Sequence, residues 1–189
     1  MIRIGILGDI GSGKSYVANN FGYSVFNADH EVSKLYKKNK KVFYKLNKIL
    51  PKYITSFPIN KNEVTNAILS NKNNLKEVID IVHLEVRKKL KFFLKKNKHK
   101  KIVILDIPLL LENKINEKKD ILVFVHTTRS KIEKKLKKRA NFNLKLYKMF
   151  KKIQFSTVYK KKKSNFIIKN NFTKKSVRIG IQEILNKIL

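Results

Sequence analysis

The stretch that most constrains the fold of this chain lies near its start. Residues 2–7 form a short, mostly apolar run with β-branched members, and residues 8–15 read Gly-Asp-Ile-Gly-Ser-Gly-Lys-Ser. The second stretch fits the pattern G-x-x-x-x-G-K-[ST] at every fixed position. From Tyr16 onward the apolar residues are spaced for one helical face. A strand, a glycine loop and a helix in this order predict a phosphate-binding loop, because inward-pointing N–H groups and a helix N-terminus attract phosphate oxygens.

The loop sequence also predicts which side chains contact the nucleotide. Lys14 is expected to reach the β- and γ-phosphates of ATP, and the Ser15 hydroxyl is expected to bind Mg²⁺. A chance Gly/Ser-rich turn is the competing interpretation, and the match at every fixed position argues against it. The expected nucleotide contacts are Gly8, Ile10, Gly11, Ser12, Gly13, Lys14, Ser15 and Tyr16.

The composition is strongly basic. The chain of 189 residues carries 45 Lys and Arg against 13 Asp and Glu, for a formal net charge of +32. Such a charge attracts polyanions, including nucleotides. The lysines are spread over most predicted helices and the aromatic residues form no base-stacking array, so we expect no specific nucleic-acid binding.

Several classes of protein are disfavoured by what the sequence lacks. It contains no cysteine, which excludes disulfides and thiolate metal sites. Nothing resembles a signal peptide, and no run approaches the ~20 apolar residues of a membrane span. We therefore expect a cytoplasmic protein with no membrane partner.

Further strands are predicted at residues 23–29, 101–106, 121–125 and 165–168, with helical patterns between them. This alternation indicates an α/β fold with a parallel sheet covered by helices. Asp29 is expected to end the second strand, and Asp106 to end the third. Ligands bind at the carboxyl ends of such strands, although Asp29 could also serve as the N-cap of a helix starting at His30.

The remaining chain is mostly helical in pattern. Residues 31–98 contain helical patterns at 37–48, 62–69 and 75–94, and this segment is too long for a simple crossover, so a substrate-covering subdomain is expected. Residues 130–153 form a long basic helical region containing Arg139, and residues 177–189 the last helix. His83 and Arg87 stand four residues apart on one helical face. Such a pair, taken alone, is more often a solvated face or a core polar contact than a site.

At residues 106–112 the sequence closely resembles the dephospho-CoA kinase family. Residues 106–112 read Asp-Ile-Pro-Leu-Leu-Leu-Glu, where the family carries Asp-Ile-Pro-Leu-Leu-Phe-Glu. The family's phosphate loop, its Asp-Ala-Asp motif (residues 27–29), its His-Pro-x-x-Arg helix (residues 83–87) and its lid arginine (Arg139) follow the same order. A glutamine matches Gln154, and the run from Lys160 to Asn170 is also similar. The resemblance covers essentially the whole chain.

The chain departs from the family pattern at several positions. Asp9 replaces a glycine and places a negative charge beside the phosphate loop. The other departures are Tyr16 for Thr, Leu84 for Pro, Lys135 for Arg, Ala140 for an acidic or polar residue, and Asn165 for Asp.

The resemblance implies a P-loop kinase fold with a five-stranded parallel sheet flanked by helices. It implies one domain, with a core at residues 1–30, 99–128 and 164–189, a helical substrate-binding insertion at 31–98 and a lid region at 129–163. The implied activity is transfer of the γ-phosphoryl group of ATP to the ribose 3′-hydroxyl of dephospho-CoA.

The resemblance also implies roles for individual residues. Asp29, Lys14 and Arg139 are the implied catalytic residues, and Asp29, His83, Arg87 and Asp106 the implied substrate-binding residues. The expected small molecules are ATP, Mg²⁺ and dephospho-CoA, bound by a monomer or small homo-oligomer. The alternatives are another small-molecule or nucleoside monophosphate kinase and a nucleic-acid-binding P-loop ATPase.

Overall fold

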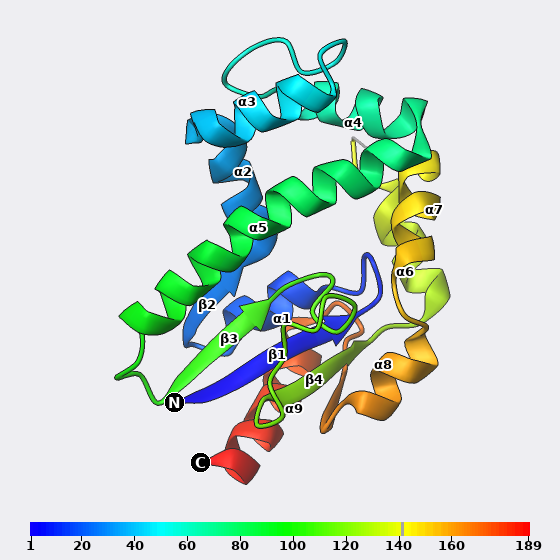
Figure 1. The fold of residues 1–189 in the computed structure, drawn as a ribbon. Coiled ribbons are helices and arrows are strands. Elements are labelled where there is room, and N and C mark those ends of the chain that lie inside the picture. Colours follow the sequence, from blue (N-terminus) through cyan, green and yellow to red (C-terminus); the bar gives the residue numbers. More distant parts are fainter. Residues whose placement is uncertain (141) are drawn as a thin grey trace. The chain divides into compact units, whose positions relative to one another are not determined.

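The strand that leads into the phosphate loop lies in the middle of a five-stranded sheet. The computed structural model describes residues 1–140 and 142–189 (Figure 1). Neighbouring strands in the order β2-β3-β1-β4-β5 all pair in parallel. The strands are β1 (Ile2–Gly8), β2 (Ser24–Asn27), β3 (Ile102–Asp106), β4 (Ile121–His126) and β5 (Phe166–Lys169). This arrangement confirms the predicted α/β fold with a parallel sheet.

Side chains of β1 alternate between two covered faces of the sheet. Ile4 and Ile6 are fully buried in a core cluster that includes side chains of α1 (Lys14–Asn20) and α9 (Lys174–Ile188). Gly5 lies between them and faces the opposite side, where a Cβ atom would meet a Leu110 side-chain atom at 2.5 Å. Burial of both faces explains why β1, β3 and β4 read as nearly continuous apolar runs.

Further helices follow the strands of the same unit. Helix α6 (Arg129–Lys137) follows β4, and α7 (Leu144–Ile153) and α8 (Thr157–Lys163) come before β5. Helix α8 packs against β1 and β4. Because all five strands are parallel, their carboxyl ends lie at the same edge of the sheet. The phosphate loop follows β1 and lies at this edge.

The chain divides into two compact units. One consists of residues Met1–Asn27 and Asn97–Leu189 and contains the sheet, and the other is the helical segment Ala28–Lys96. The helical unit contains α2 (Ala28–Lys38), α3 (Lys40–Ile49), α4 (Lys61–Ser70) and α5 (Lys72–Lys96). Within it, α5 packs against each of the other three helices.

Asparagine caps divide two predicted helices. The basic helix predicted at 37–48 is interrupted, because the Asn39 side chain accepts a hydrogen bond from the Val42 N–H and starts α3. The long helix predicted at 130–153 is likewise two helices, α6 and α7, and Asn143 caps the second. Arg139 consequently lies in the connection after α6. Helix α8 was not predicted as a separate element.

The second strand is shorter than predicted. Strand β2 ends at Asn27, and the chain passes directly into α2, so that Asp29 lies in the first turn of that helix. The expectation that Asp29 ends a strand is therefore wrong. The strand ends earlier because the β2–β3 pairing stops where Asn27 meets Asp106.

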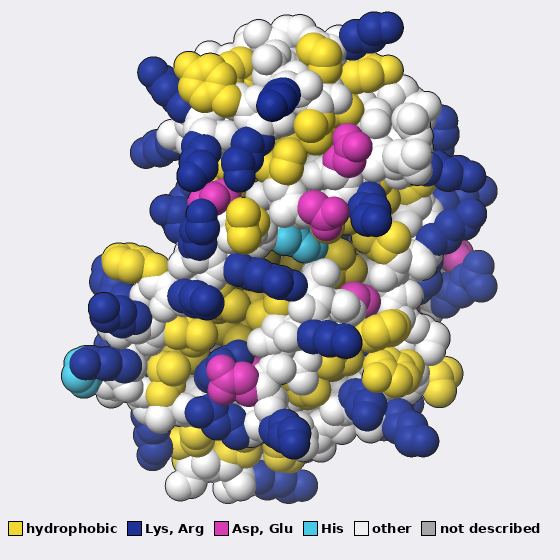
Figure 2. All heavy atoms as spheres, in the orientation of Figure 1, with side chains coloured by type: hydrophobic (Ala, Val, Ile, Leu, Met, Phe, Trp, Pro, Cys, Tyr) yellow, Lys and Arg dark blue, Asp and Glu magenta, His cyan; other side chains and the backbone are white. Residues whose placement is uncertain are grey.

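Basic side chains are spread over the surface. On the face shown in Figure 2, Lys and Arg side chains lie over nearly every region, and acidic side chains are few. The charge does not gather into one stripe on this face, which agrees with the even distribution of lysine along the sequence. Among residues 1–140 and 142–189, none of the helices combines the length and apolar character that a membrane crossing requires.

A buried ion pair ties the start of β1 to the chain before β4. Arg3 is 6% exposed, and its Nε lies 2.9 Å from Oδ1 of Asp120, whose side chain is fully buried. Its guanidinium also contacts Glu117. Removing the cation would leave the Asp120 carboxylate buried without its countercharge.

We predict that Arg3→Met lowers the free energy of unfolding by about 3 kcal/mol, because one half of a buried ion pair is removed. Urea denaturation measures the difference. Arg178→Met, at an exposed position on α9, is the matched control and should change stability by less than about 0.5 kcal/mol. Equal stability of the two variants would show that the Arg3–Asp120 contact contributes nothing.

Candidate active site

The phosphate loop requires glycine where it meets the end of β5. Gly13 directly precedes α1 and has a φ of 91°, in the left-handed region. A Cβ atom at Gly13 would lie 2.4 Å from Nδ2 of Asn170, so no side chain fits there. Gly8 and Gly11 also have positive φ values. These conformations curl the chain between β1 and α1, as the motif predicted.

The carbonyl of Ser12 is held from outside the loop by two neighbouring strand ends. Nδ2 of Asn170 donates a hydrogen bond to this oxygen at 2.9 Å, and Oγ1 of Thr127 lies 3.0 Å from it. Thr127 follows β4, Asn170 follows β5, and both are buried. These contacts orient the Ser12 carbonyl toward the interior of the protein. The loop N–H groups are then left to point toward the side where a phosphate binds.

The functional side chains of the motif lie at the accessible end of the loop. Nζ of Lys14 donates hydrogen bonds to the carbonyl oxygens of Asp9 at 2.9 Å and Gly8 at 3.2 Å. Ser15 and Tyr16 are exposed in the first turn of α1. The lysine ammonium thus lies against the loop backbone. Ser15 is the next residue in the sequence and lies in the first turn of α1, at the helix N-terminus.

A buried carboxylate ends the neighbouring strand β3. Asp106 is 3% exposed, and its Oδ2 accepts a hydrogen bond of 2.6 Å from Nδ2 of Asn27. The two residues face each other in the β2–β3 register. An asparagine amide can donate to a carboxylate, whereas a second carboxylate in its place would repel it. This pair therefore keeps Asp106 in one orientation at the ligand-binding edge.

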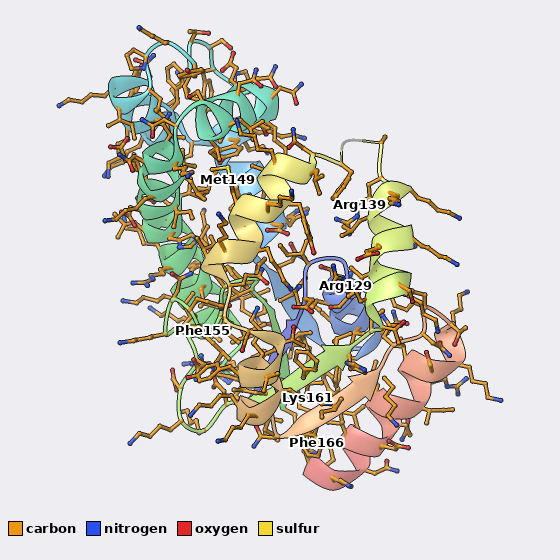
Figure 3. The ribbon with its side chains drawn as sticks, turned by 90° about the vertical axis from the view of Figure 1, so that its right-hand side faces the viewer. Arg129, Arg139, Met149, Phe155, Lys161 and Phe166 are labelled. Carbon is orange, nitrogen blue, oxygen red and sulfur yellow. The ribbon has the colours of Figure 1, made fainter. Side chains whose placement is uncertain are left out.

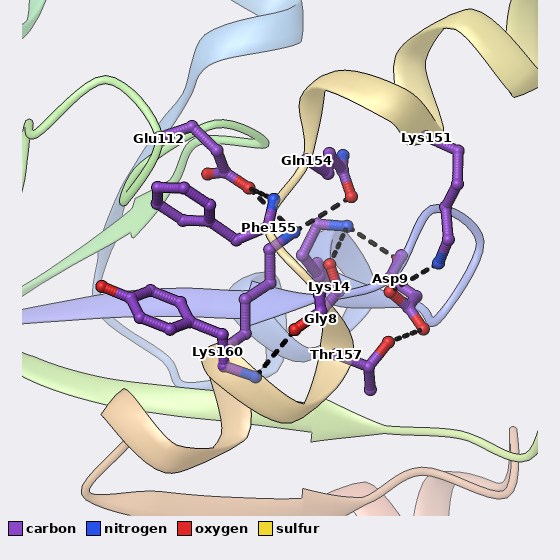
Figure 4. Close-up of polar contacts among 11 residues, drawn as sticks. Gly8, Asp9, Lys14, Glu112, Lys151, Gln154, Phe155, Thr157 and Lys160 are labelled. Carbon is purple, nitrogen blue, oxygen red and sulfur yellow. Dashed lines mark hydrogen bonds and ion pairs between the residues drawn. The ribbon is translucent and has the colours of Figure 1, made fainter.

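A buried lysine joins the chain after β3 to helix α8. Nζ of Lys160 lies 3.1 Å from Oε1 of Glu112 and donates a hydrogen bond of 3.0 Å to Gln154 (Figure 4). The Lys160 side chain is 1% exposed. Oε1 of Glu112 also accepts a hydrogen bond from the backbone N–H of Phe155 at 2.9 Å. These contacts fix the path of the chain between α7 and α8 beside the phosphate loop.

A cavity of about 750 Å³ opens beside the loop, between α6 and α7. Asp9 and Ser12 of the loop line it, together with apolar residues such as Leu136 and Tyr147 from the two helices. Figure 3 shows α6 and α7 as separate helices, with Arg139 beyond the end of α6. Arg139 is exposed.

Three of the four predicted substrate-binding residues lie in the helical unit, whereas Asp106 ends β3 in the sheet unit. Asp29 is exposed in the first turn of α2, and Arg87 is exposed on α5. His83 is half-buried one turn before Arg87. Burial and the Arg87 charge lower the pKa of the His83 imidazole, and Asp80 opposes them in part. The lowered pKa favours the neutral imidazole, which can both donate and accept a hydrogen bond.

The structure brings together the loop residues, Asp106 and the ends of β4 and β5. The roles of the predicted site residues stay predictions, for Lys14, Ser15 and Asp106 as well as for Asp29, His83, Arg87 and Arg139. Sequence reasoning missed Thr127, the Lys160–Glu112 pair and the contacts of Lys151 and Thr157 with the loop. The position of Thr127, immediately after a buried strand, is the signal that could have pointed to it, since strand ends face the ligand edge.

Comparison with known proteins decides the family. The sequence matches the dephospho-CoA kinase family over residues 2–175. The chain belongs to the dephospho-CoA kinase family. It is 33% identical to the dephospho-CoA kinase of Wolbachia pipientis wMel over 190 residues, covering 98% of this chain and 97% of the relative. The dephospho-CoA kinase of Ehrlichia canis is 29% identical, with 98% and 95% covered. The family predicted from the sequence is confirmed.

Solved structures agree with a kinase fold of this family. A crystal structure of a Thermus thermophilus protein has a TM-score of 0.78 at 22% identity, covering 100% of this chain and 98% of that chain. The dephospho-CoA kinase from Campylobacter jejuni has a TM-score of 0.64, also at 22% identity, with 98% and 96% covered. These likenesses confirm the predicted P-loop kinase fold. The dephospho-CoA kinase family consists of ATP-using transferases, and neither alternative class is favoured.

The buried Lys160 ammonium gives a test of the α8 anchor. We predict that Lys160→Met lowers the free energy of unfolding by about 3–5 kcal/mol, because Glu112 loses its countercharge in a buried position. Thermal or urea denaturation measures the loss. Lys161→Met, one residue further on and exposed, should stay close to wild type. A Lys160→Met protein as stable as Lys161→Met would contradict the proposed anchoring role.

Proposed function

We propose that this protein transfers the γ-phosphoryl group of ATP to the ribose 3′-hydroxyl of dephospho-CoA, giving CoA and ADP. The supporting observation is the family match over residues 2–175 on a chain whose phosphate loop is curled and anchored at the strand ends. A bond forms between the 3′-oxygen and the γ-phosphorus, and the bond from this phosphorus to the β,γ-bridging oxygen breaks.

The phosphate loop supplies most of the positioning. Its backbone N–H groups and the Lys14 ammonium hold the β- and γ-phosphates, and phosphoryl transfer depends mainly on such positioning and charge neutralisation. For this, Lys14 exchanges its hydrogen bonds with the Gly8 and Asp9 carbonyls for contacts with phosphate. Arg139, in the lid region 129–163, neutralises charge that develops on the transferred group.

The donor set of the loop fits Mg²⁺. This ion is usually held by one or two protein oxygen ligands together with phosphates and water, and it needs no dedicated protein cage. Among residues 1–140 and 142–189, no group of three or more His, Cys, Asp or Glu that could hold a metal ion is found. The Ser15 hydroxyl would bind the ion, and Asp106 would hold one of its waters. The bound ion supplies charge neutralisation at the phosphates.

The helical unit supplies the acceptor side of the reaction. Asp29 orients the 3′-hydroxyl and takes its proton as the bond to phosphorus forms. Arg87 pairs with the anionic acceptor, and the imidazole of His83 forms a hydrogen bond with it. The basic surface attracts both anionic substrates from a distance. We place the reaction in the cytoplasm, in a monomer or small homo-oligomer.

The function is tested by an acceptor comparison. Conversion of ATP to ADP is measured with dephospho-CoA, AMP, CMP and shikimate as separate acceptors, and the products are identified by mass. We expect turnover with dephospho-CoA and formation of CoA. Lys14→Ala is the control, and it should bind ATP poorly and transfer nothing while it melts at the wild-type temperature. Turnover with AMP, CMP or shikimate in preference to dephospho-CoA would overturn the proposal.

Asp29 gives a separate test of general-base catalysis. We predict that Asp29→Asn lowers kcat by about 10²–10⁴, because the amide keeps the size and can accept a hydrogen bond but cannot take a proton. The affinities for ATP and dephospho-CoA should change only a few-fold. Since Asp29 lies in the first turn of α2, a small loss of helix stability is also expected, and thermal melting measures it. Wild-type turnover in this variant would leave Asp29 a purely structural role.

A further inference from the structure

Asp9 joins the phosphate loop to the end of α7 and the start of α8. Its Oδ1 lies 3.1 Å from Nζ of Lys151, in the last turn of α7, and its Oδ2 accepts a hydrogen bond of 2.8 Å from Oγ1 of Thr157, the first residue of α8. Both carboxylate oxygens are therefore engaged, each by a different residue. The Asp9 side chain is only 20% exposed.

Asp9 carries a negative charge at neutral pH. Burial acts to raise the pKa of its carboxyl, but the hydrogen bonds from Thr157 and Lys151 and the charges of Lys151 and Lys160 outweigh burial and lower it. A phosphate loop that carries a carboxylate repels the phosphates it binds, unless a cation compensates the charge nearby. Position 9 therefore needs a partner in this protein that a glycine would not need.

The structure places two ammonium groups around this one residue. Nζ of Lys14 contacts the Asp9 carbonyl at 2.9 Å, and Nζ of Lys151 contacts the carboxylate of the same residue. In Figure 4 the dashed lines from the two lysines reach Asp9 from different sides. Lys14 comes from α1 and Lys151 from α7, so cations from two elements converge on this one loop residue, one at its backbone carbonyl and one at its carboxylate.

The two contacts of the Asp9 carboxylate differ in how easily they can be exchanged. The Lys151 side chain is 44% exposed and reaches Asp9 on a long, flexible stem. Thr157 is half-buried and has a short side chain at the start of α8. Lys151 can therefore turn toward an anion beside the loop, while Thr157 keeps Asp9 in place.

We propose that Lys151 contacts the nucleotide phosphates as a second cation beside Lys14, and that Asp9 is the positioning residue that holds Lys151 at the loop. The proposal rests on ATP binding at this loop, as in the proposed function. Lys151 both neutralises Asp9 and supplies a charge-assisted hydrogen bond to phosphate. The alternative is that the Asp9–Lys151 pair only fastens α7 to the loop.

A double-mutant cycle separates these two roles. The dissociation constant of ATP with Mg²⁺ is measured by calorimetry without any acceptor, for wild type, Asp9→Gly, Lys151→Met and the Asp9→Gly/Lys151→Met double variant. The melting temperature of each is recorded. Lys152→Met, an exposed lysine in the same turn of α7, is the matched control. Lys151→Arg tests whether any cation at position 151 is sufficient for ATP binding.

We expect Lys151→Met to weaken ATP binding about tenfold, because the phosphates lose a charge-assisted hydrogen bond and the Asp9 carboxylate then faces them without its cation. The double variant should bind ATP more tightly than Lys151→Met alone, since the repelling carboxylate is gone. Lys151→Arg should stay within about threefold of wild type, because guanidinium also pairs with carboxylate and phosphate. Lys152→Met should match wild type.

Two outcomes would overturn the proposal. If Asp9→Gly, Lys151→Met and the double variant all weaken ATP binding equally, the pair only fastens α7. If Lys151→Met binds ATP as Lys152→Met does, Lys151 takes no part in binding. Because no acceptor is present, these results do not depend on dephospho-CoA. If dephospho-CoA is not the acceptor, only the comparison of acceptors described above would show it.

Discussion

The phosphate site depends on the contacts that Thr127, after β4, and Asn170, after β5, make with the Ser12 carbonyl oxygen. A loop of glycines is flexible, and it costs conformational entropy to keep its N–H groups aimed at one point. Thr127 and Asn170 offset part of this cost before any ligand arrives, because both are buried and both lie at strand ends. The parallel sheet thus supplies the rigidity that the loop sequence lacks.

Each acidic group described in the sheet unit's site has a specific donor. Asp106 is paired with the Asn27 amide, Glu112 with buried Lys160, and Asp9 with Lys151 and Thr157. In a chain with 45 basic and 13 acidic residues, a carboxylate finds a cation easily, but a buried carboxylate is stable only with well-placed partners. The acidic groups of the site therefore act as anchors between segments distant in the sequence.

Much of the architecture followed from local patterns. Residues 2–21 predicted the strand, loop and helix that the structure contains, and the apolar run ending at Asp106 predicted β3. The patterns failed where a single side chain decided the boundary. Asn39 and Asn143 start new helices by capping them, although each predicted helix ran on across its position. Strand β2 ends before Asp29 because its pairing with β3 ends at Asn27. The residue pattern of a single strand does not indicate where its pairing with a neighbour ends.

The sequence by itself determined the phosphate loop, the class of fold and, through its ordered motifs, the family. These depend on residues close together in the chain, whose spacing is set by strand and helix geometry. Only the tertiary structure decided which side chains meet the loop. Lys151 is 142 residues from Asp9 and Thr157 is 148, while Asn170 lies 158 residues from Ser12. Such contacts depend on how the strands order themselves in the sheet and how helices pack on it, and no local spacing encodes them.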